Sequence, residues 1–142
     1  MGLREYEKIN IAESLLNKAL SIYEKGDNYF AALHLAGASE EILGKYLTIN
    51  GLRNTLEDEK EALISVKYDL FKIRLSEKEA ISSLIGAKNA IKHMSSEKDR
   101  IVKMNPKKDA EAMLDRAIGN WLRLKRKVTP QMDKFITRNI NL

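Results

Sequence analysis

The residues best suited to chemistry lie in one short segment, AKNAIKHM at residues 87–94. Asn89 and His93 are four residues apart, as are Lys88 and Lys92, so each pair shares one face of a helix. Histidine exchanges protons near neutral pH, and lysines hold phosphate or stabilise charge that builds up on it. The set would suit attack by a ribose 2′-hydroxyl on its neighbouring phosphate. The alternative is that these cations only complement the dipole at a helix C-terminus.

The second histidine, His34, lies between Leu33 and Leu35 in a segment of small residues. We expect it to be half-buried and bonded to a neighbouring carbonyl, because buried polar groups find partners. It would lie beside His93 only if their two helices are neighbours. The chain has no cysteine and no His-x-x-x-His spacing, so we expect no metal site. Nucleotide-loop and dinucleotide motifs are absent as well, and we expect no cofactor.

A second basic cluster follows the single tryptophan, in the segment WLRLKRK. Arg123, Lys125 and Arg126 form this cluster and are a candidate surface for phosphate or nucleic acid. They also stand in the last turns of a predicted helix, where cations complement the dipole. Trp121 shares an apolar stripe with Leu114, which favours a place in the core over base stacking.

Charge is uneven along the chain. Residues 1–71 hold 8 Lys/Arg and 12 Asp/Glu, and residues 72–142 hold 17 Lys/Arg and 8 Asp/Glu, giving net charges of −4 and +9. A basic half attracts RNA or another polyanion, or pairs with an acidic half of the same or a second molecule. No long apolar run or signal-like core is present, so we expect a cytoplasmic protein without membrane contact.

Hydrophobic periodicity and capping residues predict helices throughout. The expected helices cover about residues 3–25, 28–49, 56–73, 77–93, 107–128 and a short one at 130–140, with a loop at 94–106. Gly26 is the expected stop of the first helix and Asp27 the N-cap of the second. Thr55 with Asp58 is expected to open the helix at 56–73, and a capping box of Ser76 and Glu79 the helix at 77–93. Long helices joined by short connections favour bundling. We therefore predict one all-α domain over residues 1–142, an antiparallel bundle of four to five helices with a short C-terminal helix.

Two of these helices carry distinctive patterns. The helix at 28–49 is rich in Ala, Gly and Ser, which predicts a central, tightly packed position; Gly37 there suggests a close packing contact or a ligand. Glu41 and Lys45 stand in the favourable order for an i,i+4 ion pair. The helix at 56–73 has an apolar stripe made of Leu63, Val66, Leu70 and Ile73.

Two segments resemble the HEPN superfamily of small helical bundles. AALHLAGASEEILGKYL is similar to that family's Ala/Leu-rich segment ending in Glu-x-x-x-Lys, and KNAIKH is similar to its Arg-x(4–6)-His motif. The likeness spans about residues 5–128 and places Lys88, Asn89 and His93 on the motif positions. A likeness to a bacterial subgroup with Asn-x-x-Lys-His adds His34 and Lys92.

The resemblance implies a homodimer and one of two functions. Many HEPN proteins are metal-independent ribonucleases with a composite site across a dimer, in which His93, Lys88 and Asn89 would be catalytic, Lys92 would contact phosphate, and His34 and Glu41 would support them. Others bind nucleotide, RNA or protein without catalysis. Lys88 stands where the family has arginine and lacks the bidentate guanidinium fork. That departure favours the binding module, with the ribonuclease as the alternative.

Overall fold

The computed structural model describes residues 2–140, with side chains to residue 138. This part of the chain is all-helical and contains no strand. Its elements are α1 (Lys8–Lys25), α2 (Tyr29–Ile49), α3 (Thr55–Phe71), α4 (Glu77–Ala90), the 3₁₀ turn η1 (Glu97–Arg100), α5 (Pro106–Arg123) and α6 (Pro130–Ile140). The predicted all-α bundle with a short C-terminal helix is confirmed.

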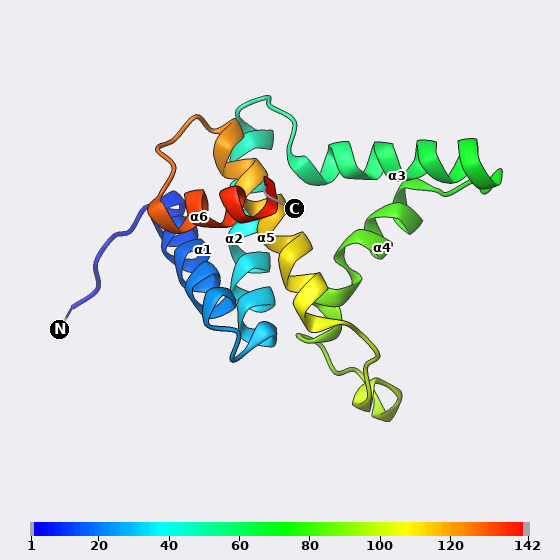
Figure 1. Cartoon of the computed structure of the whole chain (residues 1–142), viewed down its shortest axis with the longest axis horizontal. Helices are drawn as coiled ribbons and strands as arrows, with labels where there is room; N and C mark the ends of the chain where they lie inside the picture. The colour runs from blue at the N-terminus through cyan, green and yellow to red at the C-terminus, as the bar shows by residue number, and fades with distance from the viewer. Residues whose placement is uncertain (1, 141–142) are drawn as a thin grey trace.

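The core lies where α1, α2 and α5 pack together, with α6 crossing them (Figure 1). Fully buried leucines and the predicted core tryptophan fill it, among them Leu16, Leu33, Leu43, Leu114 and Trp121. The small residues of α2 let both neighbouring helices approach closely, as the sequence predicts. Ser39 adds a buried hydrogen bond from its hydroxyl to the Ala12 carbonyl, 2.8 Å long. Helix α2 is thus the central element of the bundle.

Helices α3 and α4 form a projecting hairpin, which we call the arm (residues 55–90). They pack against each other, and the far end of the arm extends away from the other helices (Figure 1). The apolar stripe predicted on α3 is therefore poorly buried. Leu63 is half-buried, whereas Val66, Leu70 and Ile73 are exposed. A two-helix hairpin has too little surface to enclose its own apolar residues, and the other helices do not cover this end of the arm. These side chains therefore stay exposed.

Helix starts follow local capping, with three corrections to the predicted boundaries. Helix α1 begins at Lys8 rather than residue 3, since residues 2–7 are extended and exposed. Asn28, not Asp27, caps α2 by accepting the Ala31 N–H at 3.0 Å. Asn54, not Thr55, caps α3. The predicted capping box of Ser76 and Glu79 is confirmed at the start of α4.

Helix ends show where backbone chemistry overrides periodicity. Gly26 takes a left-handed conformation, φ 71°, and stops α1 as predicted. Helix α4 ends at Ala90 rather than residue 93. Helix α5 runs from Pro106 to Arg123 rather than 107–128, because Lys125 adopts a left-handed φ of 56° and turns the chain. The Trp121 indole then donates to the Lys127 carbonyl at 3.1 Å, which holds that turn.

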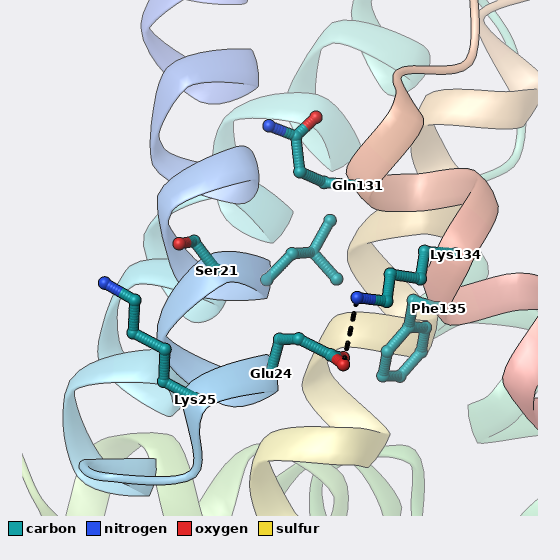
Figure 2. Close-up of a pocket in the computed structure, with 7 residues that line it drawn as sticks. Ser21, Glu24, Lys25, Gln131, Lys134 and Phe135 are labelled. Carbon is teal, nitrogen blue, oxygen red and sulfur yellow. Dashed lines mark ion pairs between the residues drawn. The ribbon is translucent and has the colours of Figure 1, made fainter.

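Helix α6 is fixed to α1 by apolar contact and by charge. Phe135 is buried in the core and makes an edge contact with Tyr23. Glu24 accepts Lys134 at 3.2 Å and Arg138 at 2.9 Å, and the first of these pairs is drawn in Figure 2. A pocket of about 210 Å³ remains between the two helices. The Glu24 carboxylate that lines this pocket is already neutralised by Lys134 and Arg138, so we assign Glu24 a structural role.

Within residues 2–140, no helix is both long enough and apolar enough to cross a bilayer.

Candidate functional site

Lys88 belongs to a buried ion-pair cluster rather than to a surface site. Its side chain is 5% exposed, and its ammonium donates to Glu41 and lies 3.6 Å from Glu40. The lysine stem crosses α2 at Gly37, where an added Cβ would fall 2.5 Å from the lysine Cδ. Gly37 is therefore the close packing contact that the sequence suggested. The predicted pairing of Glu41 with Lys45 is wrong, because Glu41 pairs with Lys88.

The two carboxylates of this cluster experience opposite environments. Burial raises the pKa of Glu40, although the nearby charges of Lys88 and Arg116 act to lower it. The hydrogen bond from Lys88 lowers the pKa of Glu41, whose side chain is 55% exposed. Consecutive residues of one helix thus converge on a single ammonium, one from the interior and one from the surface. The cluster ties α4 to α2, and both carboxylates engage the Lys88 ammonium.

A different set of predicted residues does come together. His34, Lys92 and His93 line one groove of about 590 Å³, between the first turns of α2 and the segment that follows α4. All three are exposed. The expectation of a half-buried His34 bonded to a carbonyl is wrong, because its position on α2 faces outward from the bundle. Helices α2 and α4 are in contact, and His34 and His93 line the same groove.

The same groove contains functional candidates that sequence reasoning missed. Phe30, 50% exposed, and Met94 give it apolar surface, and Arg100 adds a cation paired with Glu97 at 2.8 Å. In the sequence, Phe30 falls in the first turn of a predicted helix, and Met94 and Arg100 fall in a segment predicted to be a loop. The Ser96-x-x-Asp99 spacing could have revealed the η1 turn, because it is a capping box that presents Arg100.

Hydrogen bonds within the groove's own loop fix its shape. Asp99 accepts the Ser95 N–H at 2.8 Å and the Ser96 N–H at 3.3 Å, so its carboxylate is engaged in the turn. Asn89 contributes through its backbone, since its carbonyl accepts the His93 N–H at 3.1 Å. Its half-buried side chain does not line the groove. The imidazole and cationic side chains are exposed in the groove, together with Phe30 and Met94.

The second predicted basic cluster lies elsewhere. Arg123 pairs with Asp58 at 2.6 Å and donates to the Arg53 carbonyl at 3.1 Å. Arg126 lies over the Trp121 ring, 5.5 Å from its centroid, and Lys125 is exposed. These residues stand at the C-terminal end of α5, whereas the segment after α4, which lines the groove, lies near the beginning of α5 (Figure 1). The structure therefore does not join the two basic clusters.

A polar contact at the base of the arm was also missed. The Asn120 carbonyl oxygen accepts the Thr55 N–H at 2.8 Å and the Thr55 hydroxyl at 2.6 Å, and its amide donates to the Glu40 carbonyl at 3.3 Å. Arg116, 3% exposed, pairs with Glu59 at 2.8 Å and donates to the Leu84 carbonyl at 3.3 Å. These bonds orient the arm on the bundle.

The described residues contain no group of three or more His, Cys, Asp or Glu side chains that could hold a metal ion. Comparison of the chain with protein-family models, with curated proteins and with solved structures gives no match.

Proposed function

We propose that this protein binds single-stranded RNA or a nucleotide in the groove lined by His34, Lys92 and His93. One observation carries the proposal: two imidazoles, two cations and an exposed aromatic ring line a single groove. Lys92 and Arg100 supply the charge that attracts phosphate. Phe30 supplies a face on which a base can stack, and unpaired bases are recognised in this way.

The position of Lys88 supports binding without catalysis. In the HEPN-like hypothesis Lys88 would act on the phosphate, yet its ammonium is engaged by Glu40 and Glu41. Lys92, four residues later, is exposed in the groove and takes over the role of phosphate contact in this proposal.

A second candidate function is a metal-independent ribonuclease. The specific observation in its favour is that both histidines line the same groove. Cleavage through a 2′-hydroxyl needs one group to accept a proton and another to donate one, and two imidazoles can divide these roles. In this candidate function His34 and His93 would be the acid–base pair.

The deciding experiment measures binding and cleavage on the same RNA. Fluorescence anisotropy of a labelled mixed-sequence single strand should show binding that is weakened by Phe30→Ala, by about 5- to 150-fold if stacking is lost. Lys125→Ala is the matched control, because this exposed lysine lies outside the groove. Absence of binding by the unmodified chain, or equal losses in both variants, would overturn the proposal.

Cleavage is followed in EDTA with end-labelled RNA. Loss of cleavage in both His34→Ala and His93→Ala would establish the ribonuclease. Binding without cleavage by the unmodified chain would establish the non-catalytic module. Lys88→Ala is unsuitable here because it removes a buried ion pair.

A further inference from the structure

The two histidines that line the groove are the two histidines of the whole chain. Both are exposed, and they reach the groove from different elements, His34 from α2 and His93 from the segment after α4. We infer that they make RNA binding dependent on protons: each becomes an imidazolium ion beside a backbone phosphate, and affinity rises as the pH falls below neutral. The inference rests on the proposed function and adds its regulation by pH.

The other charged side chains at the groove cancel one another. Lys92 and Arg100 line it as cations, and Asp99 lines it as a carboxylate. Glu97 pairs with Arg100 at 2.8 Å and brings the second negative charge. Two positive and two negative charges sum to zero, so this set gains a net positive charge when the imidazoles bind protons, reaching +2 with both charged.

Both carboxylates have partners in their own loop. Asp99 accepts the Ser95 and Ser96 N–H groups, and Glu97 holds the Arg100 guanidinium. Among the described residues, α1, α3, α5 and α6 contribute no side chain to the lining. A carboxylate aimed at an imidazole would keep that imidazole charged whether or not RNA is bound. Here a phosphate entering the groove is the anion that favours the imidazolium form.

The size of the effect follows from linkage between protons and binding. Histidine ordinarily loses its proton near pH 6.5. A nearby opposite charge favours the charged form of an ionisable group by about 1–3 pKa units, and solvent exposure reduces this gain. A gain of about half to one unit makes binding about 3- to 8-fold tighter at pH 5.5 than at pH 8.5 for each histidine, or roughly 10- to 60-fold for two. The bound state holds more protons, so the added affinity is lost as the pH rises.

A single-stranded 2′-O-methyl oligouridylate with a rhodamine label is the probe for this test. Neither uracil nor a phosphodiester gains a proton between about pH 8.5 and pH 5.5, and the methyl group blocks cleavage through the 2′-hydroxyl. By fluorescence anisotropy we expect the unmodified chain to bind roughly 10- to 60-fold tighter at the acid end. Circular dichroism at each pH checks that the helices stay folded.

Glutamine variants separate the histidines from the rest of the groove. His34→Gln and His93→Gln should each lose about half of the rise on a logarithmic scale, and the double variant should bind equally at every pH. Lys92→Ala is the matched control, because lysine stays charged throughout this range and its loss should weaken binding by the same factor at both ends. A rise that survives in the double variant would overturn the inference.

The unmodified chain distinguishes failure of the inference from failure of the proposed function. Binding that does not change with pH overturns the inference and leaves the proposed function standing. Absence of binding at every pH overturns both.

Calorimetry counts the protons directly. Titration of the same probe at pH 6.5, in two buffers with different heats of ionisation, should show uptake of about half to one proton by the unmodified chain. The double glutamine variant should take up none. Binding by the unmodified chain without proton uptake would contradict the inference, whatever the anisotropy shows.

Discussion

The size of side chain that position 37 can hold is limited by Lys88, which lies far along the chain. The Lys88 stem occupies the space where a Cβ at position 37 would lie. We expect Gly37→Ala to lower the free energy of unfolding by about 1–3 kcal/mol, because overpacking outweighs the gain in helix propensity. In a Lys88→Ala background the same change should instead raise it by about 0.5–1 kcal/mol.

Denaturant unfolding of the four variants measures this coupling. Gly86→Ala is the matched control, since nothing lies within 4 Å of a Cβ added there. It should be stabilising in both backgrounds. If Gly37→Ala changes the free energy of unfolding equally with and without Lys88, the contact between Gly37 and the Lys88 stem does not contribute to stability.

Glu40 and Glu41 should contribute to stability with opposite pH dependence. A raised pKa in the folded state means that Glu40 binds its proton more tightly when folded. Stability therefore falls as pH rises from about 4.5 through the folded-state pKa. Glu40→Gln removes this penalty, so we expect it to raise the free energy of unfolding at pH 7 relative to the unmodified chain, with the difference vanishing below pH 4.5.

Glu41 should behave in the reverse sense. Its lowered pKa stabilises the folded state above about pH 4.5, and this contribution is lost as pH falls through the folded-state pKa. Glu41→Gln should therefore cost stability at pH 7 and little in acid. Urea unfolding of both variants between pH 3 and 7 checks the two signs, and parallel curves would contradict the assignment.

At the scale of elements, the arm depends on a few polar bonds at its base. Asn120 accepts two hydrogen bonds from Thr55, the first residue of α3. We expect Asn120→Ala to cost about 1–3 kcal/mol, because it leaves buried polar groups without partners. Hydrogen exchange should accelerate first in α3. Asn50→Ala, at an exposed helix end, is the control and should change little.

Element boundaries show what periodicity can and cannot predict. The existence of all the helices and the Ser76 capping box were predictable, because both depend on neighbours within a few residues. Helix α5 ends five residues early because the Trp121 indole holds the Lys127 carbonyl across a turn. Such a contact is invisible in a pattern of apolar residues. The apolar stripe expected on α3 is not a buried face, because Val66 and Leu70 are exposed and Ile73 follows the helix end at Phe71.

At the scale of the whole molecule, the two basic clusters should behave differently toward RNA. Each phosphate contact contributes a slope of about −0.7 in log K against log salt for a single strand. We expect Lys92→Ala to weaken binding and reduce the magnitude of the slope by about 0.7. Lys125→Ala and Arg126→Ala should change neither quantity. Titrations between about 50 and 200 mM salt test this, and a slope reduced by the latter pair would move the binding surface to the end of α5.

The sequence by itself determined the all-α class, the central place of α2, the core position of Trp121 and the chemical interest of residues 87–94. These follow from spacing and residue type, which are local properties. Tertiary structure decided which residues of that segment face outward. It placed Lys88 in a buried ion pair and exposed His34, because helix packing, not sequence distance, determines which side chains are desolvated. It also brought Phe30 and Arg100 to the histidines, from segments about 70 positions apart along the chain.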